Sequence, residues 1–150
     1  MEYIIDTAKV EDLDALVSFQ IDLARDYMGK ELDEETLRKG IMGGLLKRDN
    51  VLYLVARNPQ GEAIGSLMIT SEWSDWNNYK YYWIQSAYTR KDMRHKGVFT
   101  ALVNEVKKVA EKAGSPESAI RLYVERESIG AQIVYEKLGM KETTLAVYNM

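Results

Sequence analysis

The stretch Arg94-His95-Lys96-Gly97-Val98-Phe99-Thr100-Ala101-Leu102 decides the fold of this chain. It joins a strand-like run, residues 81–89, to a helical run, residues 98–112. A helix start has backbone N–H groups without intrahelical partners and carries partial positive charge, and Gly97 has no Cβ to keep a ligand away. Such a basic turn fits a phosphate-binding turn. It also fits an ordinary strand-to-helix turn with solvated cations, because short glycine motifs recur by chance.

The composition of the chain limits the functions to which this stretch can contribute. The chain has 150 residues, 46% of them hydrophobic and 29% charged, which predicts one globular domain over residues 1–150. The net charge of −3 argues against general nucleic-acid binding, so a cationic site must be local. With no cysteine and one histidine, thiolate chemistry and a multi-histidine metal centre are excluded, and we expect no metal.

Membrane insertion and export are also not expected. No apolar run approaches the roughly 20 residues that a membrane span requires. The first residues, Met1-Glu2-Tyr3-Ile4-Ile5-Asp6, lack the basic and apolar blocks of a signal peptide. The sequence therefore predicts a cytoplasmic protein.

Working outward from the turn, hydrophobic periodicity predicts alternating strands and helices. The predicted strands are residues 3–7, 51–57, 63–70, 81–89, 119–124 and 143–148. The predicted helices are residues 10–27, a segment after the N-cap Asp33, residues 98–112, and a segment from Ser128 to Leu138. Gly43 and Gly44 predict that the second helix is short or mobile, and residues 71–80 are predicted to form a polar loop.

This order of elements predicts an α/β fold with a mixed, mostly antiparallel sheet and helices on both faces. Strands joined by turns run antiparallel, whereas the crossover through helix 98–112 makes strand 81–89 parallel to strand 119–124. Ligands collect at the carboxyl ends of parallel strands. An extended, amide-containing arm of a phosphate ligand can pair with an exposed strand edge there.

Two motifs in the chain resemble those of the GCN5-related N-acetyltransferases. That family's pyrophosphate motif, Gln/Arg-x-x-Gly-x-Gly/Ala, is matched by Arg94 and Gly97, whereas Phe99 departs from it. The family's C-terminal signature is Asn-x-x-Ala-x-x-x-Tyr-x-x-x-Gly-Phe. Ala131, Tyr135 and Gly139 match it, with Ser128 and Met140 replacing the asparagine and phenylalanine.

The resemblance implies an acetyl-CoA-dependent N-acetyltransferase that acts by direct attack of a primary amine, with no metal and no covalent enzyme intermediate. It implies a cofactor site made of Ala87, Tyr88 and Thr89 along the pantetheine arm, with Arg94, His95, Lys96, Gly97, Val98, Phe99 and Thr100 around the pyrophosphate, and Ser128 in the place of the asparagine. Tyr135 is then the general acid that faces the thioester sulfur. Phe99 either packs into the core or crowds the phosphate, and we expect packing.

Several of the candidate site residues also fit a purely structural role. Its helical arc alone favours Tyr135 as a core tyrosine at the edge of the apolar face, and the acid role comes from the resemblance. Glu125 and Glu72 are the candidate general bases, but both fit solvated rim carboxylates. Tyr27, Trp73 and Trp83 are candidates for the acceptor pocket, although aromatic strand residues often serve sheet packing.

The function has two competing hypotheses. Beside the enzyme, one is a binding module that senses acyl-CoA and transfers nothing. The other is a protein-interaction domain that uses the predicted loop 71–80, which contains Trp73 and Trp76. The partners expected for the enzyme are a small-molecule or peptide amine, with no nucleic acid and no membrane. Strand 143–148 leaves a homodimer open, because it could complete a sheet between two copies.

Overall fold

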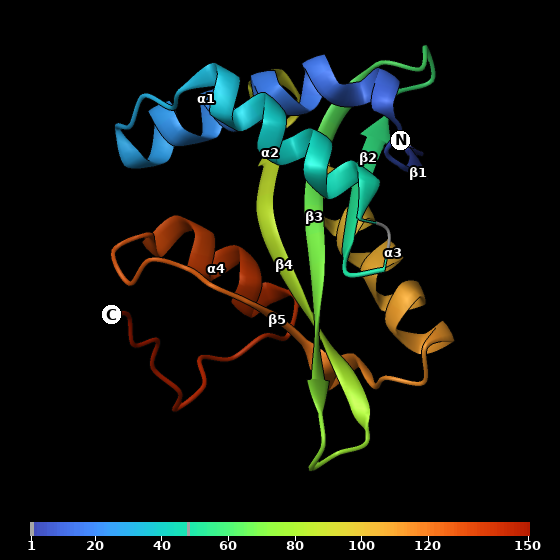
Figure 1. Ribbon diagram of the computed structural model, residues 1–150, viewed down its shortest axis with the longest axis vertical. Coiled ribbons are helices and arrows are strands. Elements are labelled where there is room, and N and C mark those ends of the chain that lie inside the picture. The colour runs from blue at the N-terminus through green and yellow to red at the C-terminus, as the bar shows by residue number, and fades with distance from the viewer. Residues whose placement is uncertain (1, 48) are drawn as a thin grey trace.

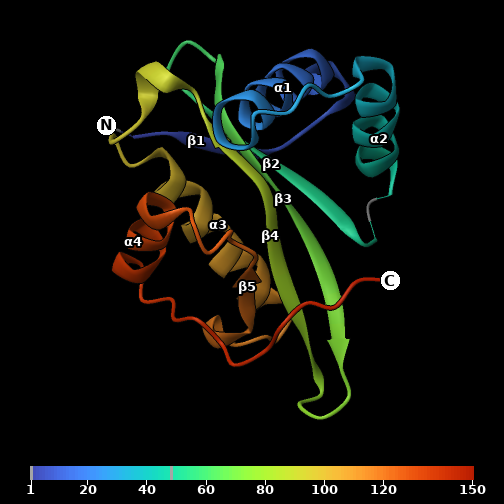
Figure 2. The same cartoon turned by 90° about the vertical axis from the view of Figure 1, so that its left-hand side faces the viewer.

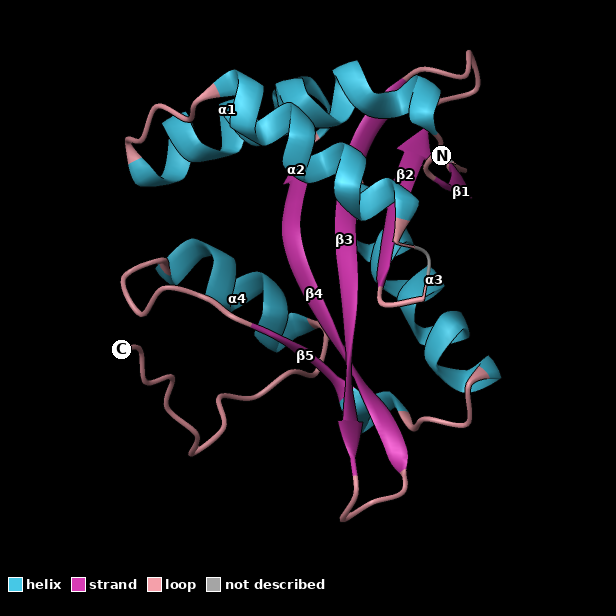
Figure 3. Ribbon diagram, in the orientation of Figure 1, coloured by secondary structure: helices cyan, strands magenta, loops and turns pink. Residues whose placement is uncertain are grey.

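The structure is a computed structural model that describes residues 2–47 and 49–150. Within these residues it forms five strands and four α-helices (Figure 1, Figure 3). The strands are β1 (Ile4–Thr7), β2 (Val51–Arg57), β3 (Ala63–Ser74), β4 (Tyr79–Thr89) and β5 (Ile120–Leu122). The helices are α1 (Leu13–Met28), α2 (Glu34–Leu46), α3 (Val98–Lys112) and α4 (Ile129–Lys137). None of these described helices is long and apolar enough to cross a bilayer.

The strands form one sheet in the order β1-β2-β3-β4-β5. Neighbouring strands are antiparallel except β4 and β5, which are parallel across the crossover through α3, as predicted. Helices α1 and α2 cover one face of the sheet and α3 covers the other (Figure 2). The predicted mixed α/β fold is therefore confirmed.

Helix α3 shows how the pattern produces the packing. Its apolar residues Val98, Leu102 and Val106 recur at helical spacing and are almost completely buried against β2, β3 and β4. The helix begins after Gly97 and ends before Gly114, and both glycines adopt left-handed backbone conformations. The turn at residue 97 is thus fixed on the sheet by the helix that it opens.

Helix α2 is longer than the sequence indicated. It spans 13 residues after its N-cap Asp33, whose carboxylate accepts from the Thr36 N–H at 3.0 Å. Gly44 lies directly against β2, since a Cβ there would come within 2.8 Å of Tyr53 Cε2. The expectation of a short helix was wrong, because this glycine permits close packing of α2 on the sheet rather than ending the helix.

The hairpin of β3 and β4 reaches further than predicted. Residues 71–74 belong to β3, and residues 79–80 belong to β4, so only a short turn remains of the predicted loop. Cross-strand pairs Glu72–Tyr81, Trp73–Lys80 and Ser74–Tyr79 extend the ladder. Each of these pairs contains one aromatic residue, and aromatic residues favour strands, which explains why a polar composition did not mark a loop.

The predicted strand at residues 143–148 is absent. The segment has no regular secondary structure, and Leu145 and Val147 are 66% and 73% exposed. Its short apolar run has no neighbouring strand to pair with among the described residues, and composition alone does not form a strand. The segment follows α4 in the chain, and Figure 1 shows the C-terminus on the side of β4 where α4 and β5 lie.

Candidate functional site

The turn between β4 and α3 has an unusual backbone. His95 has a φ of +61° and Gly97 a φ of +82°, so two left-handed residues lie in this short turn. Turns that contain left-handed residues gather N–H groups into concavities that bind anions. The Tyr3 hydroxyl donates to the Lys96 carbonyl at 2.7 Å and fixes the turn to the N-terminal segment. The backbone geometry therefore matches the phosphate interpretation of the sequence.

The start of α3 is open to a ligand. Gly97 stands at the N-cap, and no side chain in the described part of the chain caps the first N–H groups of the helix. A Cβ built on Gly97 would meet no heavy atom of the described residues within 4 Å, so their packing leaves this space clear. His95 and Lys96 are exposed beside it. An anion placed here would meet unpaired N–H donors and the positive end of the helix.

The side chain of Arg94 turns toward α1. Its Nε donates to the Thr89 carbonyl at 3.1 Å, and its guanidinium lies 5.5 Å from the Tyr27 ring centroid and 5.4 Å from that of Tyr88. Its Nη2 lies 3.8 Å from Asp26 Oδ2 and is buried without a hydrogen-bond partner among the described residues. Sequence reasoning treated Arg94 as a charge on the phosphate turn, whereas its cation contacts two aromatic rings and α1.

Strand β4 contains a bulge that sequence reasoning missed. Gln85 pairs with Met68 and Tyr88 with Ser66, so Ser86 and Ala87 together oppose one residue of β3. Ser86 adopts a φ of +54°, which costs a non-glycine residue on the order of 1–3 kcal/mol.

The bulge exchanges the two faces of the strand. Tyr82 and Ile84 face α3, whereas Tyr88 contacts Phe19 of α1 with ring centroids 5.5 Å apart. Simple alternation assigns all three β4 residues to one face. Within β4 itself, no residue type at this point signals the change.

Beyond the bulge one side of β4 has no paired strand among the described residues. Its pairs with β5 are Tyr82–Ile120, Trp83–Arg121 and Ile84–Leu122, and no described residue pairs with β4 on that side over residues 85–89. The two strands diverge toward α1 (Figure 1). The candidate pantetheine contacts Ala87, Tyr88 and Thr89 lie on this free edge, which ends close to the Gly97 turn.

Tyr135 lies against the beginning of α3. Its ring centroid is 5.8 Å from that of Phe99, which packs on the core cluster that contains Leu102, as expected. Burial raises the pKa of Tyr135 above its usual value of 10.0, and the nearby Tyr27 adds to the increase. The structure thus brings Tyr135, Phe99 and Tyr27 to the region of the turn.

A second cluster lies on β4 and β5 before they diverge. The Trp83 ring stacks on Tyr123 at 4.4 Å between centroids, and its Nε1 donates to Glu72 Oε1 at 3.3 Å. The Arg121 guanidinium lies 3.7 Å from the Tyr81 ring centroid. The carboxylate of Glu72 therefore already has a partner.

Glu125 and Ser128 lie in the loop that leads from β5 to α4. Ser128 occupies the N-cap position of α4, but its hydroxyl makes no capping hydrogen bond. The Gln132 amide donates to the carbonyls of Glu125 at 3.0 Å and Arg126 at 2.8 Å, which braces the loop. Sequence reasoning assigned no role to Gln132. The Glu125 side chain is exposed.

The tryptophans of the hairpin lie far from this region. Trp73 is 60% exposed near the end of β3, and Trp76 is 94% exposed in the turn that follows. Figure 1 shows this turn at the opposite end of the molecule from α1. The structure therefore separates Trp73 from Tyr27, although both were predicted to line one acceptor pocket.

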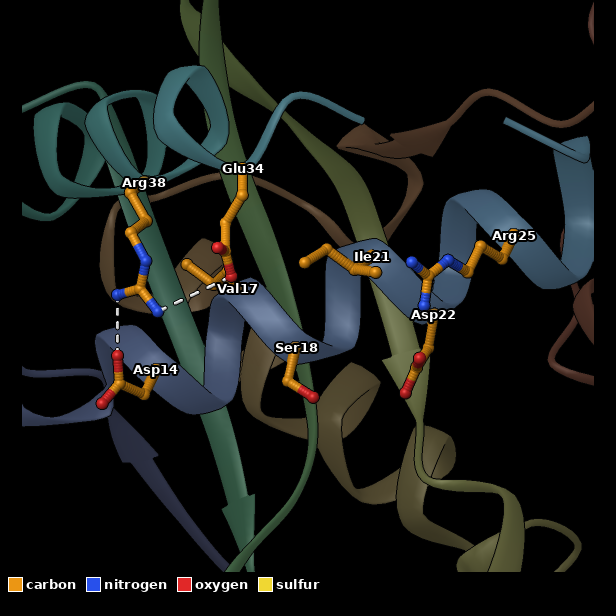
Figure 4. Close-up of a pocket in the computed structure, with 8 residues that line it drawn as sticks. All are labelled: Asp14, Val17, Ser18, Ile21, Asp22, Arg25, Glu34 and Arg38. Carbon is orange, nitrogen blue, oxygen red and sulfur yellow. Dashed lines mark hydrogen bonds and ion pairs between the residues drawn. The ribbon is translucent and has the colours of Figure 1, made fainter. Parts of the chain in front are cut away.

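A groove of about 330 Å³ lies between α1 and α2 (Figure 4). Arg38 bridges its walls, with contacts of 2.7 Å to Asp14 and 3.9 Å to Glu34. None of the residues that line it was predicted as a site residue. We consider it a seam between two helices that exposed ion pairs occupy, because both of its cations are already paired, Arg38 as above and Arg25 with Glu31.

Known proteins are similar to this chain in sequence and in fold. The sequence model of the acetyltransferase (GNAT) family matches residues 16–140. The crystal structure of a possible acetyltransferase from Clostridium difficile 630 is 37% identical and superposes with a TM-score of 0.90, covering 100% of this chain and 97% of that chain. No curated protein sequence matches this chain.

Two more distant structures have the same fold. One is a predicted acetyltransferase with acetyl-CoA from Clostridium acetobutylicum, 18% identical with a TM-score of 0.78 over 99% of this chain and 96% of that chain. The other is the aminoglycoside antibiotic 6'-N-acetyltransferase AAC(6')-Ih from Acinetobacter baumannii, 16% identical with a TM-score of 0.78 over 99% and 97%. The match over residues 16–140 and the identity to the Clostridium difficile protein make this chain a member of the GNAT acetyltransferase family.

Proposed function

We propose that this protein transfers the acetyl group of acetyl-CoA to a primary amine by direct attack of the amine on the thioester. The observation that carries the proposal is the free edge of β4 over residues 85–89, which leads to the uncapped start of α3. An edge of this kind accepts an amide-containing arm, and a helix start accepts a phosphate. Acetyl-CoA contains both parts in one molecule.

The residues present fit this cosubstrate. The space around Gly97 is clear, the first N–H groups of α3 have no side-chain cap, and Lys96 is exposed beside them. In the proposal these groups hold the pyrophosphate, and backbone groups of Ala87, Tyr88 and Thr89 pair with the pantetheine amides. Acetyl-CoA supplies an acetyl thioester, which an amine attacks without a covalent enzyme intermediate.

Tyr135 is the proposed general acid. The C–N bond forms as the C–S bond breaks, and the sulfur leaves with negative charge. A tyrosine hydroxyl is protonated at neutral pH, and burial raises the pKa of Tyr135 further, so the hydroxyl is able to donate to the departing thiolate. No hydrogen bond to another described residue engages that hydroxyl.

The proton of the amine needs an acceptor, since an alkylamine has a pKa near ~10.4 and is mostly charged at neutral pH. Glu72 and Glu125 remain the two proposed bases. Glu72 is oriented by the Trp83 indole, whereas Glu125 is exposed on the loop after β5. Tyr27 and Trp83 are the proposed acceptor contacts, because each lies in one of the two aromatic clusters beside β4.

A calorimetric titration with acetyl-CoA, followed by measurement of thiol release with a panel of amines, tests the proposal. We expect binding with one site per chain and amine-dependent thiol release. No binding up to millimolar acetyl-CoA would refute the proposal. Substitution of Glu72→Gln and Glu125→Gln in separate variants then identifies the base, because only the true base lowers kcat while leaving acetyl-CoA affinity intact.

An acyl-CoA sensor is the second candidate, and the state of the two carboxylates favours it. Glu72 is hydrogen-bonded to Trp83, and Glu125 is exposed, so neither is buried in a position that marks a base. The two functions differ in one measurement. A sensor binds acetyl-CoA but releases no thiol above the background rate with any amine in the panel.

A further inference from the structure

The buried face of α1 carries one polar side chain that packing does not explain. The buried residues of this helix are Leu16, Val17, Phe19, Gln20 and Ala24. Gln20 is 9% exposed, and its Nε2 donates to the Ser86 carbonyl of β4 at 2.9 Å. An apolar side chain would fill this place without the cost of burying an amide. A specific hydrogen bond at the bulge is therefore the feature that requires glutamine.

This hydrogen bond fixes the direction of the peptide group between Ser86 and Ala87. The described part of the chain has no cis peptide bonds, so the Ser86 carbonyl and the Ala87 N–H point in opposite directions. Because the carbonyl points to Gln20 on α1, the Ala87 N–H points away from α1. Ser86, which carries this carbonyl, is the residue with the left-handed φ of +54°.

From this geometry we propose that Gln20 is a positioning residue, which holds the bulge so that the Ala87 N–H donates to the acetyl carbonyl oxygen. The inference rests on the proposed acetyl transfer. A donor aimed at that oxygen stabilises the negative charge that develops when the amine attacks. Gln20 touches neither the acetyl group nor the amine in this scheme, and it acts through the peptide group that it orients.

The main test compares Gln20→Met with Phe19→Leu. Gln20→Met keeps the volume and removes the donor, whereas Phe19→Leu weakens the neighbouring contact of α1 with Tyr88 and leaves the Ser86 carbonyl bonded. Removal of one oxyanion donor lowers kcat by roughly 10²–10³-fold. We expect Gln20→Met to lower kcat at least about tenfold, with the KM for acetyl-CoA changed less than about threefold, and Phe19→Leu to lower kcat far less.

A binding measurement tests the same inference without turnover. The Ala87 N–H contacts the acetyl oxygen and has no such partner in free CoA. The wild-type chain should therefore bind acetyl-CoA more tightly than CoA, and Gln20→Met should abolish that difference while its affinity for CoA stays within about twofold. The binding measurement distinguishes failure of the proposed function from failure of the role of Gln20. A wild-type chain that binds acetyl-CoA but transfers nothing refutes the proposed function. The difference in affinity between acetyl-CoA and CoA still decides the role of Gln20.

A third variant serves if Gln20→Met does not fold. Gln20→Glu keeps the shape, and its carboxyl group donates a hydrogen bond only when protonated. We expect the ratio of its kcat to that of wild type to rise as the pH is lowered. Equal losses in Gln20→Met and Phe19→Leu, equal weakening of CoA and acetyl-CoA binding, or a pH-independent ratio for Gln20→Glu would each overturn the proposal.

Discussion

Two glycines at the ends of α3 allow the proposed phosphate turn to be tested against a matched control. Gly97 precedes the helix with a φ of +82°, and Gly114 follows it with a φ of +80°. At both positions a Cβ would meet no heavy atom within 4 Å over residues 2–47 and 49–150. Alanine at either site therefore suffers the same backbone strain and creates no clash within the protein.

The size of the effect on stability follows from this strain. A left-handed conformation costs an L-residue roughly 1–2 kcal/mol, and alanine recovers about 0.4–1 kcal/mol through the lower entropy of its unfolded chain. Each variant should lose about 1 kcal/mol in its free energy of unfolding, and so about 2–4 °C in Tm for a chain of this length. Thermal and urea unfolding of both variants measure this loss.

Acetyl-CoA affinity should distinguish the two variants. In Gly97→Ala the new methyl group occupies the clear space where the pyrophosphate approaches the backbone, so we expect at least about a tenfold weaker Kd, or about 1.4 kcal/mol. Gly114→Ala should bind as wild type, because it lies at the other end of the helix. Equal affinities in the two variants, by isothermal titration, would refute the assignment of the turn.

Three further changes have defined outcomes. Tyr135→Phe should lower kcat at least about tenfold in single-turnover assays, with acetyl-CoA affinity unchanged. Arg57→Met should lower the free energy of unfolding by about 2–3 kcal/mol, since Arg57 binds the buried carboxylate of Asp12 at 2.9 Å. If residues 143–148 pair two copies, the full chain should sediment as a dimer and a chain that ends at Glu142 as a monomer. The same oligomeric state for both chains would exclude that role of residues 143–148.

The same ion pair gives a pH dependence with a known sign. Burial raises the pKa of Asp12, but hydrogen bonds from Arg57 and from the Lys9 N–H more than offset it, and the pKa is lowered from 3.8. A carboxyl group with a lowered pKa stabilises the fold above its unfolded value. Wild type should therefore lose stability as the pH falls below about 3.8, and Arg57→Met should lose less over that range.

The sequence predicted those features that depend on local periodicity and chain order. The crossover through residues 98–112 required β4 and β5 to be parallel, and the uncapped glycine turn followed from the residues themselves. The terminal strand at residues 143–148 was wrong because a strand also needs an edge beside it, which periodicity does not contain. The direction of the Arg94 side chain was beyond the sequence for a similar reason, since it depends on where α1 ends.

Strain at the candidate site is held by residues distant in sequence. Ser86 and His95 are left-handed although neither is glycine, and both lie beside the free edge of β4. Gln20, 66 residues from Ser86, donates a hydrogen bond to the Ser86 carbonyl. Tyr3, 93 residues from Lys96, donates one to the Lys96 carbonyl in the turn that contains His95. Because neither brace belongs to a family motif, substitutions at Gln20 or Tyr3 should alter the site while leaving every motif residue in place.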